Sequence, residues 1–245
     1  MTVLDDLANA TLRIECGSAC GSGFQFLSDD IIVTNCHVID SHLVNKSVIT
    51  ARTGDGRHSE AELLAFSPKD EYDFAILRAA NTLGTGRMIL EPLQADRLAL
   101  GSEVAFAGFP HGIHDLLVHS AFISGFCKDL GFFLDGSVNA GNSGGPIIDA
   151  QTGRVIGITT QRRFIGAPEM QRMSEEAAEL QTYLEKIRGS GQVFVMGVDF
   201  GEMARLMARN FSLLKEVIDA NANAGIGIGF RIRFALEKCR ELGFY

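Results

Sequence analysis

The stretch Asn139-Ala-Gly-Asn-Ser-Gly-Gly-Pro146 is the most informative part of this 245-residue chain. Glycines flank Ser143 and permit a turn too tight for larger side chains, which leaves the serine hydroxyl projecting. Successive backbone N–H groups of such a turn can point at one position, as an oxyanion hole requires. The stretch therefore predicts a nucleophilic serine. The order of its catalytic partners along the chain must show which fold carries this serine.

The order of the histidines along the chain separates two possible folds. The same serine pattern occurs in α/β-hydrolases, in which a histidine follows the serine. Here all six histidines precede Ser143: His37, His42, His58, His111, His114 and His119. This order excludes an α/β-hydrolase and leaves the order His, Asp, Ser, which is that of the chymotrypsin-type barrel proteases.

Candidates for the histidine and the acid lie at the ends of apolar runs. His37 closes the run Ile31-Ile-Val-Thr-Asn-Cys-His, and Asp73 opens the run Asp73-Phe-Ala-Ile-Leu. Asp70, three residues earlier, is a second candidate for the acid. Residues at strand ends are well placed to meet in space.

Short apolar runs and frequent turns predict an all-β fold from Thr11 to about Thr160. The chain has 27 glycines, 5 prolines and no tryptophan, which favours many tight turns over a helical bundle. The predicted strands include Gly23-Phe-Gln-Phe-Leu, Ile31-Ile-Val-Thr, Leu43 to Ala51, Asp73-Phe-Ala-Ile-Leu, Val104-Ala-Phe-Ala and Arg154-Val-Ile-Gly-Ile-Thr.

After Arg163 the pattern changes to that of helices. Apolar residues recur at steps of three and four between Pro168, which can start a helix, and Gly189, which can end one. A second helix is predicted to start at Asp199, since Asp199 and Glu202 have the spacing of a capping box. A short terminal helix is expected at about 234–242. The apolar stripe of the first helix consists of Met170, Met173, Ala177, Leu180, Leu184 and Ile187.

Taken in order, several short pieces resemble the trypsin-like serine proteases, and more narrowly the HtrA/Deg family. They cover roughly residues 10–160 and 224–245. The resemblance implies an all-β fold of two antiparallel six-stranded β-barrels. The pieces are Gly21-Ser-Gly-Phe, Thr34-Asn-Cys-His-Val, Asp73-Phe-Ala-Ile-Leu, Gly108-Phe-Pro-His-Gly, Ile123-Ser-Gly, Asp135, Gly141-Asn-Ser-Gly-Gly-Pro, Gly153-Arg-Val-Ile-Gly-Ile-Thr and Gly227-Ile-Gly-Phe.

The resemblance also implies a serine endopeptidase that works through an acyl-enzyme. Ser143 would be the nucleophile, His37 the general base and acid, and Asp73 the residue that orients the imidazole. The family pattern places the acid directly before Phe-Ala-Ile-Leu, which favours Asp73 over Asp70. The N–H groups of Gly141 and Ser143 would form the oxyanion hole.

Substrate-binding candidates follow from the same alignment of positions. Ser137, six residues before the nucleophile, corresponds to the floor of the primary pocket, and Thr159, Thr160 and Gln161 correspond to its wall. A neutral floor predicts small or medium apolar side chains. Asp135 matches an acid that the family also has, so it does not indicate selection of basic residues. Arg162 and Arg163 lie just beyond the wall and are expected to be solvated charges; the alternative is that they favour an acidic substrate residue.

The chain departs from its relatives after residue 161. We expect one protease unit over 1–245, with an N-terminal barrel at about 8–95 and a C-terminal barrel at about 100–161 and 224–245. A helical insertion at about 162–223 separates the parts of the second barrel. It leaves from the pocket wall, so we expect it to gate access, to receive an activating protein or to mediate homo-oligomerisation.

Asn142 stands where pancreatic-type enzymes have an aspartate that pairs with a new N-terminus, so activation by that ion pair is not expected. The HtrA family also has asparagine there and is regulated by loop ordering. A catalytically silent binding or sensor module on the same fold is the alternative function.

Composition limits partners, cofactors and location. The formal net charge of −8 argues against nucleic acid, and no apolar run is long enough for a membrane span. The start Met1-Thr-Val-Leu-Asp-Asp lacks the pattern of a secretory signal, and five scattered cysteines do not form a disulfide framework, so a cytoplasmic bacterial protein is expected. Protein or peptide substrates are expected, with no cofactor or metal. Cys36, beside His37, is interpreted as a packed thiol.

Overall fold

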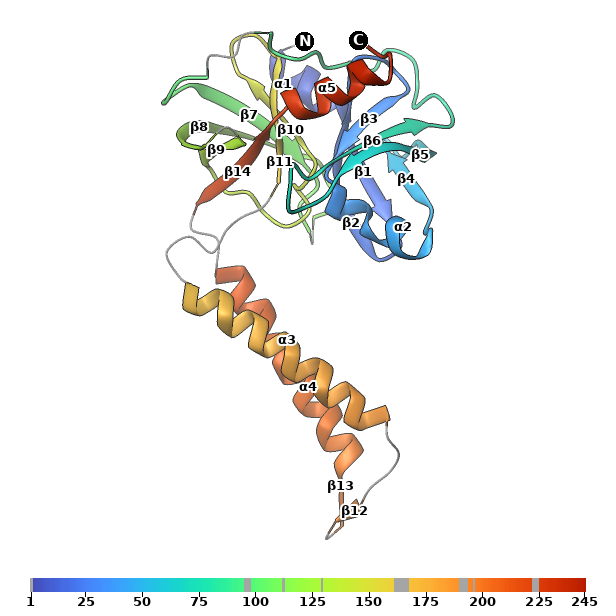
Figure 1. Cartoon of the computed structure of the whole chain (residues 1–245), viewed down its shortest axis with the longest axis vertical. Coiled ribbons are helices and arrows are strands. Elements are labelled where there is room, and N and C mark those ends of the chain that lie inside the picture. The colour runs from blue at the N-terminus through green and yellow to red at the C-terminus, as the bar shows by residue number, and fades with distance from the viewer. Residues whose placement is uncertain are drawn as a thin grey trace. The chain divides into compact units, whose positions relative to one another are not determined.

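The computed structural model describes residues 2–94, 98–111, 113–128, 130–160, 168–189, 194–195, 197–221 and 225–245. The chain forms two compact units. The first comprises Met1–Arg162 and Gly225–Tyr245, and the second comprises Arg163–Ala224. Figure 1 shows strands in the first unit and two long helices in the second.

The first unit begins with a closed antiparallel barrel in the order β1-β2-β3-β6-β5-β4. Strand β1 alternates inward apolar and outward polar residues, with Leu12 and Ile14 buried between the less buried Arg13 and Glu15, whereas all four residues of β3 are buried. The strands are β1 (Thr11–Cys16), β2 (Ala19–Gln25), β3 (Ile31–Thr34), β4 (Ile49–Arg52), β5 (His58–Ser67) and β6 (Phe74–Ala79).

A second closed antiparallel barrel has the order β10-β11-β14-β9-β8-β7. Its last strand, β14, follows the insertion in sequence, yet it pairs with both β11 and β9 and so closes the barrel. The prediction of two six-stranded barrels with a helical insertion and a C-terminal helix is confirmed. The strands are β7 (Glu103–Gly108), β8 (Leu117–Cys127), β9 (Gly131–Asp135), β10 (Pro146–Asp149), β11 (Val155–Thr159) and β14 (Ile226–Arg231).

One apolar core cluster contains side chains of both barrels and of the C-terminal helix α5 (Arg233–Glu241). Phe24 and Phe26 of the first barrel, Ala105 and Ile158 of the second and Leu236 of α5 all belong to it and are buried. Because these side chains form one buried cluster, they fix the two barrels against each other. Loops from both barrels can therefore hold catalytic groups at fixed distances.

Three short helices of the first unit were not predicted. They are α1 (Val3–Ala10), the 3-10 helix η1 (Cys36–Ile39) and α2 (Asp40–Asn45). The strand expected over Leu43 to Ala51 is wrong in its first part: α2 runs to Asn45, Lys46 is left-handed at φ 61°, and β4 begins at Ile49.

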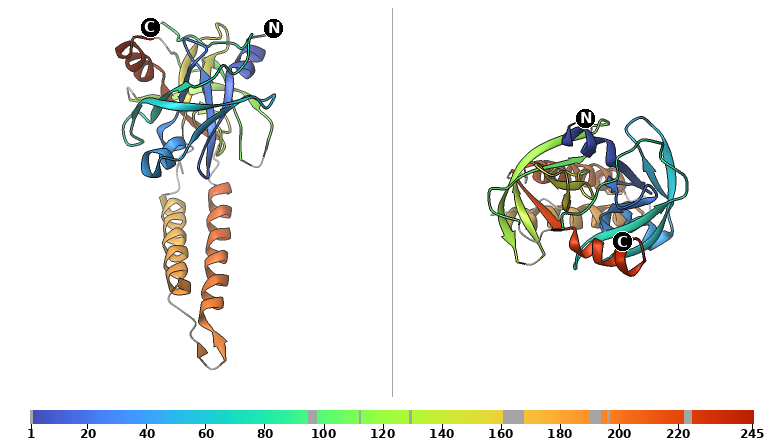
Figure 2. Two further views of the ribbon diagram at one scale, coloured as in Figure 1. Left: turned by 90° about the vertical axis from the view of Figure 1, so that its right-hand side faces the viewer. Right: turned by 90° about the horizontal axis from the view of Figure 1, so that it is seen from above.

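The second unit is a helical hairpin. Its helices, α3 (Pro168–Gly189) and α4 (Phe200–Asn221), lie side by side, and a small sheet of β12 (Phe194–Val195) and β13 (Val198–Asp199) lies between them in sequence (Figure 2). Asp199 Oδ1 accepts hydrogen bonds from the Gly201 and Glu202 amides, which caps α4 where the sequence predicted its start. In the described residues, neither helix is long and apolar enough to cross a membrane.

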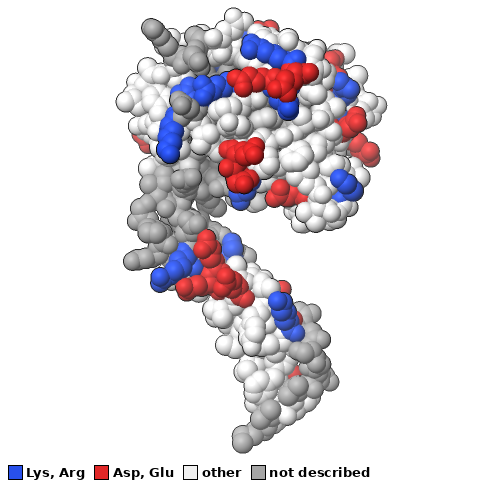
Figure 3. All heavy atoms as spheres, in the orientation of Figure 1, with Lys and Arg blue, Asp and Glu red and all other residues white. Residues whose placement is uncertain are grey.

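Charged side chains of both signs are mixed over the face of the molecule shown in Figure 3. Lys and Arg side chains alternate with Asp and Glu over the described residues on this face.

Candidate active site

His37 and Asp73 form the best-defined part of the site. The His37 Nδ1 atom lies 2.8 Å from Asp73 Oδ2, and the His37 backbone N–H donates to Asp73 Oδ1 at 3.1 Å. His37 lies on η1, directly after β3, and Asp73 lies directly before β6, which pairs with β3. The pairing of these two strands brings together residues that are 36 positions apart in the sequence.

Asp73 is held rigidly by its surroundings. Its side chain is 1% exposed, and its backbone has a left-handed φ of 46°, which aspartate tolerates better than most residues. Asn35 Nδ2 donates to its carbonyl at 2.6 Å, and Thr160 Oγ1 donates to its Oδ2 at 2.8 Å. The alternative acid, Asp70, is exposed, and no hydrogen bond joins it to His37 in the described structure.

Glycines and Ser22 shape the loop that carries Ser143. Gly141 and Gly144 have φ values of 95° and 88°, and a Cβ at Gly141 would collide with the carbonyl oxygen of Phe109. Buried Ser22, on β2 of the first barrel, donates its hydroxyl to the Gly141 carbonyl at 2.7 Å. Its backbone N–H donates to the Ser143 carbonyl at 2.8 Å. The serine loop of the second barrel is thus fastened to the first barrel.

The Ser143 hydroxyl is directed at Thr160. Ser143 Oγ donates to the Thr160 carbonyl at 2.7 Å, and in the described residues no hydrogen bond joins it to the His37 ring. Since the Thr160 hydroxyl donates to Asp73, Thr160 contacts both the candidate nucleophile and the candidate acid. The serine would have to turn about its side-chain torsion to reach the imidazole.

The predicted oxyanion donors are available. Among the described residues, the N–H groups of Gly141 and Ser143 have no acceptor in the protein. The preceding carbonyl, that of Ala140, accepts a hydrogen bond from the His111 N–H at 2.7 Å.

Asn142 is fully buried within the same loop. Neither its side-chain oxygen nor its side-chain nitrogen has a hydrogen-bond partner among the described residues. Buried polar atoms without partners are costly, by about 1–3 kcal/mol each.

The substrate-binding candidates differ in their placement. Ser137 is exposed, in the segment between β9 and Gly141. Thr159 is fully buried, and its hydroxyl has no partner among the described residues. The Thr160 hydroxyl is bonded to Asp73 rather than turned to solvent. Gln161 lies outside the described residues, as do Arg162 and Arg163.

A small cavity of about 110 Å³ lies beside the site. His111, which binds the Ala140 carbonyl, is part of its wall, and its Nε2 lies 3.0 Å from the Cys20 carbonyl oxygen. The remaining wall residues are Arg13, Cys20, Phe109, Pro110, Ile113 and His114.

Cys36 is buried, and burial together with the carboxylate of Asp73 raises its pKa to about 12. A thiol with such a pKa is a poor nucleophile near neutral pH. Among the described residues, no three His, Cys, Asp or Glu side chains gather as metal ligands would.

Two contacts at the site were not predicted from the sequence. They are the pair of hydrogen bonds made by Thr160 and the attachment of the serine loop by Ser22. The sequence offers only a weak signal for either: Thr160 follows directly on a strand, and Ser22 lies in the piece Gly21-Ser-Gly-Phe. A hydroxyl residue at such positions has many possible partners, and only the packed structure selects one.

Comparison with known proteins assigns the fold and a family. The model of the trypsin-like peptidase domain matches residues 21–158, more than half of the chain. In the crystal structure of the serine endoprotease from Yersinia pestis, 57% of that chain matches 66% of this one at 28% identity and a TM-score of 0.54. The crystal structure of Deg5 matches over 82% of its length and 65% of this chain, at 22% identity and a TM-score of 0.56, which supports the fold alone.

Curated relatives carry a similar description. A probable periplasmic serine endoprotease of the DegP-like type from Halomonas elongata is 35% identical over 149 residues, or 58% of this chain and 29% of that protein. The corresponding protein of Pseudomonas fulva is 30% identical over 210 residues, or 80% of this chain and 40% of that protein. The chain thus spans less than a third of the length of the first of these relatives.

Proposed function

Because the chain belongs to the trypsin-like peptidase family, we propose that it is a serine endopeptidase with Ser143 as nucleophile, His37 as general base and Asp73 as the orienting acid. The observation that carries the proposal is the 2.8 Å contact between His37 Nδ1 and the buried Asp73 carboxylate. With Nδ1 held by the acid, Nε2 is the ring nitrogen left to accept a proton.

We propose that the reaction proceeds in two stages, acylation and hydrolysis. The Ser143 hydroxyl leaves the Thr160 carbonyl, gives its proton to His37 Nε2, and forms a bond from Oγ to the peptide carbonyl carbon. The N–H groups of Gly141 and Ser143 bind the developing oxyanion, each contributing about 3 kcal/mol. The protonated imidazole then gives its proton to the leaving amine as the C–N bond breaks. Water, deprotonated by His37, hydrolyses the acyl-enzyme.

We also propose that activity is regulated by a partner or by ordering of the loops. One observation supports this: the Ser143 hydroxyl is hydrogen-bonded away from His37. The insertion begins two residues after Thr160, the residue that holds the Ser143 hydroxyl. An activating protein or a second copy bound to the insertion could therefore act on the serine.

Substrate class and location remain predictions of the same kind. We propose protein or peptide substrates with a small or medium apolar side chain at the cleaved residue, because the predicted pocket floor, Ser137, is neutral. Cleavage profiles on a peptide library test this. We propose a cytoplasmic location because all five cysteines are free in the structure, although the relatives are named periplasmic; cell fractionation tests this.

An active-site fluorophosphonate probe tests the catalytic assignment. The wild-type chain should be labelled at Ser143, and Ser143→Ala should abolish labelling and lower turnover by roughly 10⁶-fold. The matched control is Ser120→Ala, which removes an exposed hydroxyl on β8 and should leave labelling unchanged. Labelling that survives Ser143→Ala would show that another residue is the nucleophile. A wild-type chain that stays unlabelled with candidate partners present would favour the silent binding module.

A further inference from the structure

Helix α4 carries a stripe of large apolar side chains that its neighbour α3 does not cover. Toward α3, the helix presents small residues instead: Ala204 and Ala208 are buried, as are Ser174 and Ala177 on α3. Small residues let the two helices approach closely, and this leaves the large side chains outside the contact. The stripe consists of Met203, Leu206, Met207, Leu213, Leu214 and Val217, which are 39–58% exposed.

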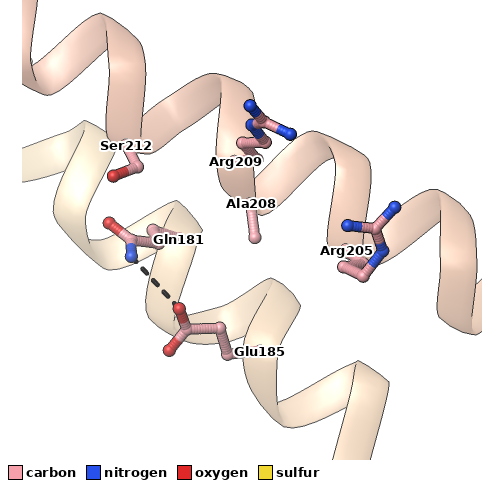
Figure 4. Close-up of a pocket in the computed structure, with 6 residues that line it drawn as sticks. All are labelled: Gln181, Glu185, Arg205, Ala208, Arg209 and Ser212. Atoms are coloured by element: carbon pink, nitrogen blue, oxygen red, sulfur yellow. Dashed lines mark hydrogen bonds between the residues drawn. The ribbon is translucent and has the colours of Figure 1, made fainter.

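The opposite side of the hairpin is polar. A groove of about 230 Å³ lies there between the helices and is lined by Gln181, Glu185, Arg205, Ala208, Arg209 and Ser212 (Figure 4). At about 100° per residue, Arg205 and Ser212 lie roughly 150° around α4 from Asn210, the middle of the stripe. The apolar stripe and the polar groove therefore face different sides of the hairpin.

The stripe is symmetric about Asn210. Apolar residues lie three, four and seven positions before Asn210 and again three, four and seven positions after it. In an antiparallel pair of identical helices related by a two-fold axis, a residue before the axis meets the residue equally far after it on the other copy. Met203 would then face Val217 of a second copy, and every apolar side chain of the stripe would face another.

Asn210 is the exposed polar residue at the centre of this stripe. Positions 203, 206, 210, 213 and 217 follow the alternating steps of three and four that are typical of helix-to-helix seams. A single asparagine in such a seam fixes the register of the two helices, at some cost in stability. Because an amide side chain both donates and accepts, two Asn210 side chains on a two-fold axis can satisfy each other.

The exposed area matches that of a stable dimer. Three more large side chains, Met173, Leu180 and Tyr183 of α3, are 44–62% exposed, on the side of α3 away from Gln181 and Glu185. At about 200 Å² for a fully exposed large side chain, these three and the stripe expose roughly 800 Å² together. A standard interface buries about 800 Å² on each partner, whereas the largest apolar patch of a monomer is usually about 300–600 Å².

Charge argues against a membrane surface as the occupant. Interfacial helices carry an excess of Lys and Arg on their polar face. Here α3 has five acidic and three basic residues, and α4 has three of each. An anionic bilayer would gain little attraction from this hairpin.

We propose that the apolar face of the hairpin binds the same face of a second copy of the chain, with the two α4 helices antiparallel and Asn210 on the two-fold axis. The stripes of the two α4 helices then pack against each other between the two hairpins. This deepens the partner role proposed above for the insertion. The test of this dimer needs no hydrolytic activity. The dimer proposal can therefore fail while the protease proposal stands, and the protease proposal can fail while the dimer proposal stands.

Analytical ultracentrifugation of the full chain from about 1 to 100 µM tests the surface. The wild type should sediment as a dimer, and Leu206→Lys with Leu213→Lys should weaken dimerisation at least about 100-fold. The control adds the same charge on the polar side, as Thr182→Lys with Ser212→Lys, and should leave the dimer intact. Circular dichroism checks that both variants keep their helices. A monomeric wild type, or a dimer unaffected by the leucine substitutions, overturns the proposal.

Disulfide cross-linking tests the register without relying on a destabilised variant. The five native cysteines all lie in the first unit, so the wild type under the same oxidant gives the background. Asn210→Cys should cross-link two copies efficiently, since the residue meets itself on the axis. Leu206→Cys should cross-link at least about tenfold less, because that position meets Leu214 of the second copy and its own equivalent lies about 12 Å farther along the helix. Equal cross-linking at both positions overturns the antiparallel register, and binding of the monomer to anionic vesicles overturns the choice of occupant.

Discussion

Replacing each of two adjacent buried threonines by valine tests the role of Thr160. Valine has nearly the same shape as threonine but lacks the hydroxyl. In Thr160→Val, the buried Asp73 carboxylate loses the 2.8 Å hydrogen bond from Thr160 Oγ1. A hydrogen bond to a charged group contributes about 1.5–3 kcal/mol, so the free energy of unfolding should fall by that amount. The carbonyl of residue 160, which accepts from Ser143, is retained.

Thr159→Val is the matched control. Thr159 is equally buried, but its hydroxyl has no partner among the described residues. Removing an unsatisfied buried hydroxyl should leave stability unchanged or raise it by up to about 1 kcal/mol. The two substitutions remove the same hydroxyl group from neighbouring positions. Their effects on the free energy of unfolding should have opposite signs or differ by at least about 1.5 kcal/mol.

Urea unfolding followed by circular dichroism measures the difference, with the slope of the transition compared among the three proteins. Kinetics on a cleaved peptide add a second readout: a less firmly held Asp73 orients His37 less well, and kcat/KM of Thr160→Val should fall between about ten- and a hundredfold. Thr159→Val should keep its kcat/KM. Equal stability of Thr160→Val and the wild type, or equal losses in both variants, would refute the assignment of Thr160 as a positioning residue.

Asp73→Asn should lower kcat by roughly 10⁴-fold. The chain should stay folded, because asparagine also tolerates a left-handed backbone. Peptide hydrolysis measures the first effect and circular dichroism the second, and near-normal turnover would point to another acid. Burial lowers the pKa of His119 from its ordinary value of 6.5, so the unfolded chain takes up the proton at a higher pH than the folded chain does. The free energy of unfolding should therefore decline as pH falls below about 6.5. The urea midpoint between pH 7 and 5 should decline less in His119→Gln than in the wild type, and parallel curves for the two proteins would contradict this. Burial raises the pKa values of Cys36 and Cys239 to about 12. In the native chain, iodoacetamide at pH 8 should therefore modify Cys127 at least about 100-fold faster than either of these two cysteines, as measured by mass spectrometry. Unfolding in urea should remove the difference in rate.

The barrel strands were largely predictable because their signal is local and repeated. A run such as Asp73-Phe-Ala-Ile-Leu contains a short continuous apolar stretch and the start of β6 within a few residues. Helix α2 was missed for the opposite reason: it has six residues, and no side chain caps its start. The apolar residues of α2 alone are as typical of a strand as of a helix. Only the packing of Leu43 on the first barrel distinguishes the two.

The residues of the candidate site were selected from the sequence, but their hydrogen bonds could not be predicted from it. Chain order and the resemblance selected His37, Asp73 and Ser143, because each lies in a short recognisable piece. The direction of the Ser143 hydroxyl depends on one side-chain torsion and on the carbonyl of a residue 17 positions later. No local pattern encodes such a choice. The same holds for Ser22, whose hydroxyl crosses from one barrel to the other to reach Gly141.

The position of β14 has a consequence for synthesis of the protein. This strand closes the second barrel, and its Ile228 carbonyl accepts the N–H of Thr160, yet it follows the helical insertion in the chain. A ribosome must therefore translate the roughly 60 residues of the insertion, which takes about 3–12 s at 5–20 residues per second, before the barrel can close. During that interval Ser143 has already been synthesised, but the strand that anchors Thr160 does not yet exist. The order of the elements therefore delays closure of the second barrel until the hairpin has been made.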